Sequence, residues 1–520
     1  MTGETFFEVR DEQAAAVAAP GRATLDYGGL HRAMERVTRS LRALGIEPGE
    51  AVAVAAANGP EALVATLGVA AVAAVAPLNP ALTAPECRFL LADLSARALI
   101  VVGDAGEAAL EAARDLAVPV LAARPSPGGP AGLLDVERPA GEPRPPARAG
   151  GRDPDVALLL HTSGTTARPK LVALRRGALA RSARAIARGL ALGPADRCLN
   201  VMPLFHVHGL VGAALASLAS GGSVCCTAGF NPLRFARWLD EEAPTWYTAV
   251  PSMHQAVVAR LDRGVQPART ARGLRFVRSC SSPLPSAVRD ALASCLEVPV
   301  VNAYGMTEAA HQVSSTSVEA GGSPGSVGRP VVPGGTAAGV PVCPVGVSSG
   351  PEVRVIDPAG TWLPPGAVGE IALRGDTVIT AYEHPVEANQ SSFLGGWLRT
   401  GDRGVVDARG EISLTGRLKE LINASGEKIS PYEVEDVLLS HPAVVEAVCF
   451  AIPSAARGER VGAAVVLGEG AATDERTLRG YLAERLAPCK VPERVLTLAA
   501  LPKGPTGKLQ RLGLAARLGL

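Results

Sequence analysis

Short apolar runs alternate with longer amphipathic segments through about the first four-fifths of the chain. This alternation predicts an α/β fold with largely parallel sheets, in which ligands bind where the carboxyl ends of strands meet. Helices are expected at Tyr27–Leu44, Gly177–Leu190 and Pro251–Leu261. Strands are expected at Ala51–Ala56, Ala98–Val102, Val156–His161, Cys198–Met202, Ser223–Thr227, Trp246–Val250, Leu274–Ser279 and Val298–Ala303.

The pattern changes at Gly416, where turn residues and a polar loop precede an amphipathic helix predicted at Pro431–Ser440. Strand patterns at Val444–Ile452 and Gly462–Leu467, a helix near Thr477–Leu486 and the polar tail PKGPTGKLQR follow. We therefore predict a large N-terminal domain, residues 1–415, and a small α+β C-terminal domain, residues 416–520.

Three segments are harder to interpret. The longest apolar stretch, Ala62–Leu78, is interrupted and Ala-rich, so a buried helix is predicted rather than a membrane span. The Pro- and Gly-rich segment Ala123–Asp155 is predicted to be a flexible surface connection. Val332–Gly350 is either a disordered loop or an added strand pair, and the sequence does not decide between them.

Composition narrows the class of protein. With 520 residues the chain is too long for a single hydrophobic core, so more than one domain is expected. Its 47% hydrophobic residues are enough to bury a large core. Its 51 basic and 50 acidic residues give a net charge of +1, which offers no broad attraction to nucleic acid or an anionic membrane. The nine cysteines are scattered without CxxC spacing, so neither a disulfide framework nor a zinc site is indicated. Because the N-terminus also lacks a signal-peptide pattern, a cytoplasmic protein is expected.

The first candidate for chemistry is LLLHTSGTTARPK, Leu158–Lys170, in which an apolar strand leads into small hydroxyl residues, glycine and a lysine. Backbone N–H groups, hydroxyls and an ammonium of this kind can grip a polyphosphate. The loop is not a Walker A motif, because GxxxxGK[ST] is absent. An ordinary Ser/Thr/Gly loop explains the pattern equally well.

Two further segments add polar groups at strand ends. In NAYGMTEAAH, Asn302–His311, Tyr304 offers a surface on which a purine can stack, Thr307 can hold a phosphate oxygen and Glu308 is a hard-oxygen ligand suited to Mg²⁺. In GGWLRTGDRG, Asp402 could accept hydrogen bonds from both hydroxyls of a ribose, although an Asp in a Gly-rich turn is more often a turn residue.

The order and content of these motifs resemble the adenylate-forming superfamily of acyl-CoA synthetases, peptide-synthetase adenylation domains and luciferases. The resemblance spans most of the chain, from NGPEALVATLGVAAVAAVAPLNPALT to the PTGK tail. TWYTAVPSMHQ, RSCSSPLP, GMTEAAH and GRLKELINASGEKISPYEVE are most similar to oxalate–CoA ligases and related acyl-CoA synthetases. The resemblance implies a β-subdomain in the large domain, a mobile C-terminal domain, and the use of ATP, Mg²⁺ and CoA.

The resemblance also implies roles for individual residues of the ATP site. Ser281 and Ser282 would line the adenine and acyl pocket, and Tyr304 would stack on adenine. Asp402 and Arg417 would contact the ribose. The phosphate loop would comprise Thr162, Ser163, Gly164, Thr165, Thr166 and Lys170.

Further implied roles concern the reaction and the domain motion. Thr307 would contact phosphate, Glu308 would bind magnesium, and Lys508 would be the catalytic lysine. His206 would gate or shape the acyl pocket, unless it is an ordinary core histidine. Lys419 would lie at the hinge. The loop Ser425, Gly426 and Glu427 would approach the tunnel for the thiol.

In such chemistry a substrate carboxylate, already ionised at neutral pH, attacks the α-phosphate of ATP and pyrophosphate leaves. Catalysis then requires neutralisation of the charge that moves onto the leaving group. The phosphate loop departs from the usual TSGTTGxPKGV, because Ala167 and Leu171 stand where glycine is common. Neither departure removes a reacting group, so we expect an active enzyme.

The acid and its acceptor stay open at this stage. Amino-acid-activating relatives carry an Asp near the YTAVP strand, and this chain has none there. His311 and Ser281 occupy positions where oxalate-activating relatives place donors for the distal carboxylate, which favours a small or polar acid. His311 could equally be a helix-start residue without a ligand.

The first hypothesis is therefore a CoA ligase for such an acid, monomeric or homodimeric. The second keeps the adenylating chemistry but loads a carrier protein or activates nitrite to diazotise an arylamine. The third is a non-catalytic nucleotide-binding protein.

Overall fold

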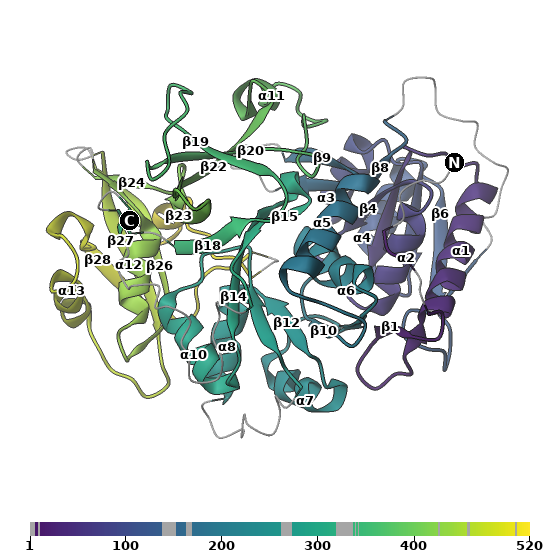
Figure 1. The fold of residues 1–520 in the computed structure, drawn as a ribbon, viewed down its shortest axis with the longest axis horizontal. Helices are drawn as coiled ribbons and strands as arrows, with labels where there is room; N and C mark the ends of the chain where they lie inside the picture. The colour runs from purple at the N-terminus through teal and green to yellow at the C-terminus, as the bar shows by residue number, and fades with distance from the viewer. Residues whose placement is uncertain are drawn as a thin grey trace.

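The computed structural model describes residues 6–8, 11–137, 152–162, 169–261, 273–318, 336–337, 340–341, 343–424, 427–454, 458–504 and 507–520, with backbone only between 336 and 348. Figure 1 shows an N-terminal α/β layer at one side, a central sheet flanked by helices, and a C-terminal α+β unit at the other side. The predicted fold class, an α/β N-terminal region with a β-subdomain and a smaller C-terminal α+β domain, is confirmed.

The first sheet has seven strands in the order β7-β6-β5-β3-β4-β8-β9, parallel except at the two edges. Alternate residues of β3 face opposite sides, because side chains of a strand point alternately up and down. Val52 and Val54 pack with α1 and α2, whereas Ala51 and Ala53 pack with α3 and α4. The strands are β3 Ala51–Ala56, β4 Ala74–Leu78, β5 Ala98–Val102, β6 Val120–Pro125, β7 Leu134–Val136, β8 Val156–Thr162 and β9 Lys170–Arg175, and the helices are α1 Tyr27–Ala43, α2 Pro60–Ala70, α3 Ala84–Asp93 and α4 Glu107–Asp115.

The second sheet has fourteen strands and changes character at β14. On one side β13, β12, β10, β11 and β1 follow in parallel; on the other, β15, β18, β23, β22, β20 and β19 are antiparallel. The parallel half comprises β1 Ala15–Ala18, β10 Arg197–Asn200, β11 Ser223–Cys226, β12 Trp246–Ala249, β13 Phe276–Ser279 and β14 Val300–Met306, and β2 Leu25–Asp26 pairs antiparallel with β1 at its edge. The antiparallel half comprises β15 His311–Ser315, β18 Cys343–Ser348, β19 Glu352–Ile356, β20 Gly369–Arg374, β21 Phe393–Leu394, β22 Trp397–Val406 and β23 Glu411–Arg417.

Helices on the second sheet carry several of the residues discussed below. A π-helical segment, His208–Leu215, runs into α6 Ala216–Ala219. The other helices of this region are α5 Arg176–Gly189, α7 Pro232–Glu242, α8 Pro251–Leu261, α10 Ser286–Leu296 and α11 Ala388–Ser392.

The C-terminal sheet has five strands, in the order β25-β24-β27-β26 with β28 on β27. Its core is separate from the cores of the other two sheets. The expected boundary at residue 416 lies inside β23, and the first strand of the C-terminal sheet begins at Ile422. The elements are β24 Ile422–Ala424, β25 Glu427–Ile429, α12 Pro431–Leu439, β26 Val444–Ser454, β27 Gly458–Leu467, α13 Glu475–Ala483, β28 Arg494–Thr497 and α14 Leu514–Arg517.

The prediction of one buried helix at Ala62–Leu78 is wrong. Helix α2 ends at Ala70, and Ala74–Leu78 is strand β4, paired with β3 and β8. A strand buried on both faces of a parallel sheet is a continuous apolar run, so periodicity cannot distinguish it from a buried helix.

Strands also occupy parts of the two predicted loop segments. In Ala123–Asp155, β7 pairs with the end of β6, so the expectation of a flexible connection is wrong for Leu134–Val136, while residues 138–151 lie outside the described part. In Val332–Gly350, β16 (Thr336–Ala337) pairs with β17 (Val340–Pro341), and β18 joins the large sheet. The strand-pair alternative therefore fits the described residues of that segment.

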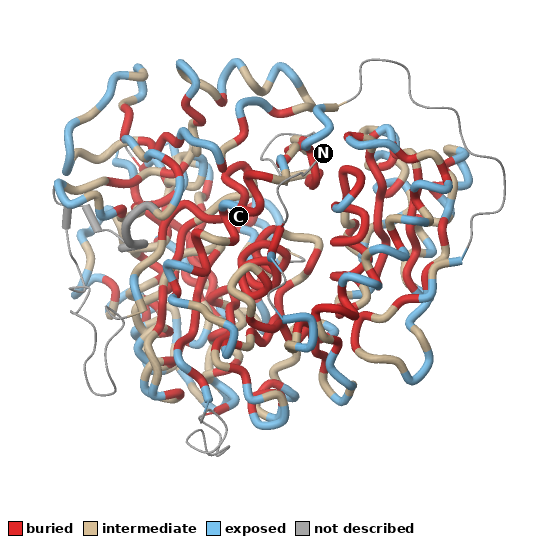
Figure 2. The backbone as a smooth tube through the Cα atoms, turned by 45° about the vertical axis from the view of Figure 1, so that its right-hand side comes forward, coloured by how far each residue is buried: buried red, intermediate tan, exposed pale blue. Residues whose placement is uncertain are grey.

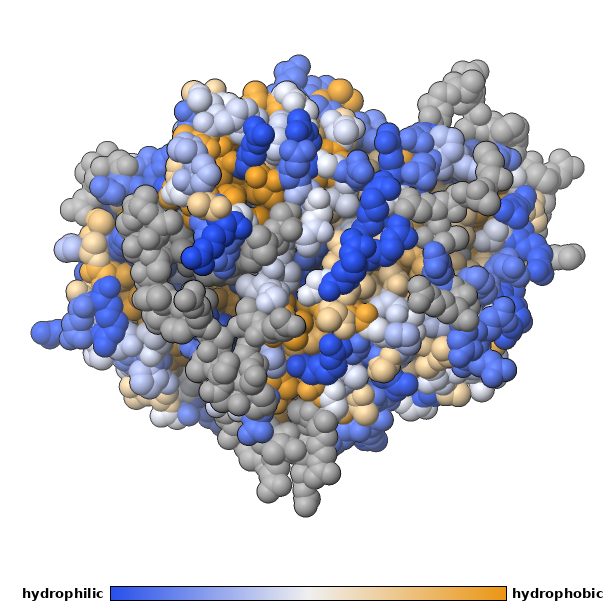
Figure 3. Space-filling view, viewed as in Figure 1, coloured by the Kyte–Doolittle hydropathy of each residue, from blue (hydrophilic) through white to orange (hydrophobic). Residues whose placement is uncertain are grey.

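Buried residues form the inner strands and the inward faces of the helices, and exposed residues concentrate on the connections (Figure 2). Hydrophilic residues dominate the face in Figure 3, although hydrophobic residues also reach the surface over the region of β20 and β22. Among the helices that the structure describes, none combines the length and apolarity that crossing a membrane requires.

The close approach of α1 and α2 depends on Gly68, where an added Cβ would lie 2.7 Å from Cβ of Val37. We expect Gly68→Ala to destabilise the protein by about 1–3 kcal/mol through overpacking, seen as a lower Tm. Gly189→Ala is the matched control, because no atom lies within 4 Å of an added Cβ at the end of α5. It should leave Tm unchanged or raise it. Equal Tm values for the two variants would contradict the tight contact.

Candidate active site

The predicted phosphate loop joins β8 to β9. Ser163, Gly164, Thr165 and Thr166 lie outside the described residues, but both ends of the loop are described. Thr162 and Lys170 face each other in the antiparallel ladder, with the Thr162 hydroxyl 3.4 Å from the carbonyl oxygen of Lys170. The two described ends of the loop therefore lie side by side in adjacent antiparallel strands.

Lys170 and Glu308 share a neighbour, Tyr382. The Lys170 ammonium lies 4.2 Å from the centroid of the Tyr382 ring and donates to Ser392 Oγ at 3.0 Å. The Tyr382 hydroxyl donates to Glu308 Oε1 at 2.8 Å. Burial lowers the pKa of Lys170, and Glu308 opposes this shift. Glu308 and Thr307 form a 3₁₀ turn directly after β14.

Asp402 connects β14 with the end of β23. Its Oδ2 accepts a hydrogen bond from the Tyr304 hydroxyl at 2.6 Å, and its Oδ1 accepts one from Arg417 Nε at 2.8 Å. The buried Asp402 carboxylate raises the pKa of Arg417, and burial raises that of Tyr304. Three residues predicted to bind the nucleoside thus form one network, although both oxygens of Asp402 already have a partner.

Lys508 reaches this region from the C-terminal tail. The tail contacts α8, because Ser252 Oγ donates to the carbonyl oxygen of Gly507 at 2.7 Å. The Lys508 side chain remains accessible to solvent, yet the protein atoms around it lower its pKa, and Arg417 adds repulsion. Asp402 acts in the opposite direction on the same ammonium. The structure therefore brings Lys508 to the network of Asp402 and Arg417.

A second polar cluster lies beside β13 and β14. The rings of His208 and His311 stack with centroids 5.2 Å apart. His208 lies 3.0 Å from Ser281 Oγ through Nδ1 and 2.7 Å from Thr248 Oγ1 through Nε2. Arg278 donates to His311 Nε2 at 3.1 Å. Burial lowers the pKa of both histidines well below the usual value, and Arg278 lowers them further, so both rings are neutral at pH 7.

Backbone geometry brings the cluster together. His311 has a φ of 87°, and an added Cβ at Gly212 would lie 2.4 Å from His311 Nε2. The π-helical segment that contains Gly212 therefore packs directly against the imidazole. Ser281, with a φ of 75°, follows β13 in the loop that leads to α10. Such strained conformations concentrate at functional sites.

The other predicted residues are placed as follows. His206 is half-buried and packs on Phe205, and burial together with Lys508 lowers its pKa to about 4. Ser282 is half-buried. Lys419 lies between β23 and β24, and its charge acts on Lys170. Glu427 opens β25 and is exposed, whereas Ser425 and Gly426 lie outside the described residues.

Besides the hydrogen bond from Ser252 to Gly507, a contact of Asp436 holds the C-terminal unit against the rest of the chain. Asp436 of α12 accepts hydrogen bonds from the backbone N–H of Ser286 at 2.8 Å and from its hydroxyl. The carboxylate thus satisfies the free N–H at the start of α10. Within the C-terminal unit, Arg511 pairs with Glu420 and Glu435, which ties the tail after Lys508 to α12.

Comparison with protein families decides the class of this chain. The family model for AMP-binding enzymes matches residues 6–383, and the model for the AMP-binding enzyme C-terminal domain matches residues 433–508. The chain belongs to this family.

Similar proteins agree with this assignment. This chain is 37% identical to oxalate–CoA ligase of Arabidopsis thaliana over 502 residues, which cover 95% of this chain and 94% of the relative. It is 36% identical to sulfoacetate–CoA ligase of Cupriavidus necator, covering 94% and 92%. ATP-bound MatB from Rhodopseudomonas palustris superposes with a TM-score of 0.82 at 28% identity, covering 98% and 97%.

The AMP-binding enzyme is thus an AMP-forming acid–thiol ligase, which uses ATP, Mg²⁺ and CoA. The described residues contain no group of three or more His, Cys, Asp or Glu side chains that could hold a metal. A lone, largely buried carboxylate such as Glu308 still fits Mg²⁺, because this ion takes most of its ligands from substrate phosphates and water.

Arg278, His208 and Tyr382 were missed by sequence reasoning. His208 lies two residues after His206 in PLFHVHG, and Arg278 is the first residue of RSCSSPLP. Their positions in these two motifs could have indicated both residues. Tyr382 carried no local motif. Its position follows from the folding of the segment between β20 and α11 back onto the end of β14.

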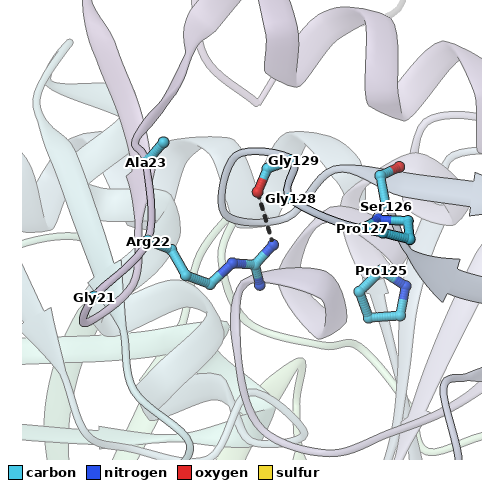
Figure 4. Close-up of a pocket in the computed structure, with 8 residues that line it drawn as sticks. All are labelled: Gly21, Arg22, Ala23, Pro125, Ser126, Pro127, Gly128 and Gly129. Atoms are coloured by element: carbon cyan, nitrogen blue, oxygen red, sulfur yellow. Dashed lines mark hydrogen bonds between the residues drawn. The ribbon is translucent and has the colours of Figure 1, made fainter.

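A separate open pocket lies between the loop after β1 and the loop after β6 (Figure 4). Arg22 lines it, but its guanidinium already pairs with Glu61 and donates to the carbonyl oxygens of Gly129 and Pro130. With its donors occupied in this way, Arg22 offers no evident site for an anion.

The histidine beside Lys508 provides a test of the domain arrangement in solution. By NMR, the His206 imidazole should titrate near pH 4, and Lys508→Ala should move its pKa upward, because the ammonium contributes to the shift. A neutral, buried histidine stabilises the fold above its unfolded pKa of about 6.5. That contribution is lost as pH falls toward 4. His206→Asn assigns the resonance. Titration near 6.5, or no response to Lys508→Ala, would contradict this arrangement.

Proposed function

We propose that this AMP-binding enzyme activates a small carboxylic acid that carries a second anionic group, and transfers the acyl group to CoA. One observation carries the proposal: Arg278 is fully buried, and its described partners are the side chains of Thr248, His311, Gln312 and Cys280, without a carboxylate among them. None of the ion pairs among the described residues includes Arg278, and its Nε has no hydrogen-bond partner there. A buried cation is costly without an anion. An anionic end of the substrate supplies one.

The surrounding donors suit the same ligand. His311 Nε2 accepts from Arg278, so a neutral His311 carries its proton on Nδ1. For His208 we assign a chain in which Arg278 donates to Thr248, Thr248 to His208 Nε2, and His208 Nδ1–H to Ser281. This direction leaves the Ser281 hydroxyl hydrogen free to donate to an anion. We therefore keep for Ser281 and His311 the substrate roles suggested by the sequence, and for His206 the role of shaping the acyl pocket.

The relatives support this choice of acid. Oxalate and sulfoacetate are both small acids with two anionic groups, and the ligases named for them are each more than one-third identical to this chain. A substrate end placed beside a buried guanidinium and two buried imidazoles would be a poor fit for a fatty chain. The second anionic group of the acid would face Arg278, and its reacting carboxylate would point toward Lys508.

In the first half-reaction, a carboxylate oxygen of the acid attacks the α-phosphorus of ATP, and the bond to the bridging oxygen of pyrophosphate breaks. Lys508 neutralises charge that develops on the phosphate, and Lys170 and Thr162, with Ser163–Thr166, bind the leaving phosphates. Tyr304 and Ser282 line the adenine pocket, Asp402 and Arg417 orient the ribose, and Thr307 contacts phosphate. Glu308 would hold Mg²⁺, which neutralises charge on the phosphates when bound.

In the second half-reaction, the CoA thiol loses its proton, its sulfur attacks the acyl carbon, and AMP leaves. We propose that the chain divides near residue 415, and that the unit from 416 to 520 turns about Lys419 to withdraw Lys508. The loop Ser425–Glu427 would then approach the thiol. The contacts of Asp436 with Ser286 and of Gly507 with Ser252 link the two units, which supports the view that this structure represents the adenylating arrangement.

Two alternatives are distinguished by products. Pyrophosphate release without formation of a CoA ester favours loading of a carrier protein or activation of nitrite. Absence of pyrophosphate release with every acid tested and with nitrite favours a non-catalytic nucleotide-binding protein. Cytoplasmic location agrees with the free state of every cysteine whose side chain is described. We expect a monomer or homodimer, to be checked by light scattering.

A panel of acids with and without CoA tests the proposed substrate class. Small acids with a second carboxylate or a sulfonate should release pyrophosphate and form CoA esters, while long-chain acids should do neither. Arg278→Met should raise KM for these acids at least about tenfold, since hydrogen bonds to charged groups contribute about 1.5–3 kcal/mol. Arg374→Met is the matched control, because Arg374 pairs with Glu352 at the surface. Unchanged KM in a folded Arg278→Met protein would refute the assigned contact.

Removal of the Lys508 ammonium separates the two half-reactions. Lys508→Ala should abolish adenylate formation, measured as pyrophosphate release, because the charge on the phosphate is no longer neutralised. The same variant should largely retain thiol transfer from a supplied acyl-adenylate, measured as CoA-ester formation. Lys503→Ala serves as the control, since Lys503 pairs with Glu446 within the C-terminal unit. Undiminished pyrophosphate release by Lys508→Ala would rule out the catalytic role.

A further inference from the structure

Tyr382 lies between two charged groups that come from separate parts of the chain. Its side chain is buried, with 5% exposed, in the segment between β20 and α11. One end of the phenol donates to Glu308 Oε1 at 2.8 Å, and the face of the ring lies 4.2 Å from Lys170 Nζ. The same residue therefore touches both the predicted magnesium ligand and the last residue of the predicted phosphate loop.

The position of Tyr382 is fixed from several sides. Its backbone N–H donates to Asn389 Oδ1 at 2.8 Å, and its carbonyl oxygen accepts from Asn389 Nδ2 at 3.0 Å. Phe393 packs edge-on against the ring at a centroid distance of 6.0 Å. On the far side, Lys170 also donates to Ser392 of α11. A short segment thus clamps the ring and the ammonium together.

The phenol is a hydrogen-bond donor to Glu308, because a tyrosine hydroxyl carries its proton at neutral pH. A donor aimed at Oε1 restricts the rotation of the Glu308 carboxylate. The ring face attracts the Lys170 ammonium by a cation–π interaction of about 0.5–2 kcal/mol. Glu308 and Lys170 also attract each other, and Tyr382 contacts both of them.

We propose that Tyr382 is a positioning residue, which holds the Glu308 carboxylate through its hydroxyl and the Lys170 ammonium through its ring, so that both meet the phosphates of magnesium-bound ATP. The two contacts are separable, because phenylalanine keeps the ring and loses the donor. This role rests on the functions proposed above for Glu308 and Lys170. Residues that orient a metal ligand typically change metal affinity or activity by about 10–100-fold when mutated.

The test compares Tyr382→Phe with Tyr382→Leu in binding measurements that contain neither acid nor CoA. Calorimetry gives the Kd of ATP with Mg²⁺ and in EDTA, and electron paramagnetic resonance reports free Mn²⁺ in the presence of ATP. We expect Tyr382→Phe to weaken Mn²⁺ and Mg²⁺-dependent ATP binding about tenfold while ATP binding in EDTA stays unchanged. Tyr382→Leu should weaken ATP binding both with the metal ion and in EDTA. Tyr481→Phe, which removes a surface hydroxyl that donates to the carbonyl oxygen of Ser440, should leave the metal dependence unchanged.

A double-mutant comparison distinguishes positioning from general loss of structure. If Tyr382 acts through the carboxylate, Tyr382→Phe should add nothing in a Glu308→Gln background, with circular dichroism and Tm showing that all variants fold. Equal, additive losses in both backgrounds, or a wild-type metal dependence in folded Tyr382→Phe, would overturn the role. If the wild-type protein itself fails to bind ATP with Mg²⁺, the proposed function fails, and this role fails with it.

Discussion

A buried positive charge is the constraint on which this account of the site depends. The guanidinium of Arg278 lies at the centre of the second sheet with only neutral groups among its described hydrogen-bond partners. Around it the protein has kept His208 and His311 neutral, so that the cluster does not accumulate further charge. The π-helical segment, the missing side chain at Gly212 and the left-handed backbone of His311 all serve to bring these rings to the guanidinium. In the function proposed above, an anionic group of the substrate completes this arrangement.

The nucleotide side of the site has the opposite character, because its charges are already balanced. Asp402 satisfies Arg417 and Tyr304, and Glu308 is held by Tyr382, which also contacts Lys170. Lys508 differs from these groups, because its place depends on contacts between the C-terminal unit and the rest of the chain. A preorganised site of this kind spends little energy on rearrangement when ATP binds. This arrangement is consistent with a reaction controlled by the arrival and withdrawal of Lys508.

Much of the fold could be predicted from hydrophobic patterning. The strands Ala51–Ala56 and Ala98–Val102 have the expected bounds, because each is a short apolar run between turn residues. The prediction of one helix at Ala62–Leu78 was wrong because a buried helix and a buried central strand have the same composition. The family resemblance implied a β-subdomain, but the individual antiparallel strands β19 to β23 were not predicted, since their partners are set by long-range pairing that local patterns do not encode.

The site was predictable to the extent that its residues stand in motifs. Tyr304, Asp402, Arg417 and Lys508 come from four distant segments, and the structure brings them to one region. Arg278 and Tyr382 were not foreseen, because their importance lies in burial and in partners far along the chain. For Ser163–Thr166 the prediction stands on sequence alone, since they fall outside the described residues.

The central claim is that the enzyme selects a small acid with a second anionic group. Mass spectrometry of the adenylate formed from a mixture of acids with ATP and Mg²⁺, in the absence of CoA, tests it most directly. The mixture would hold dicarboxylic, sulfonated, monocarboxylic, long-chain and α-amino acids at equal concentration. The account predicts that the adenylates of small acids with two anionic groups dominate. Predominant adenylates of long-chain or α-amino acids would contradict it.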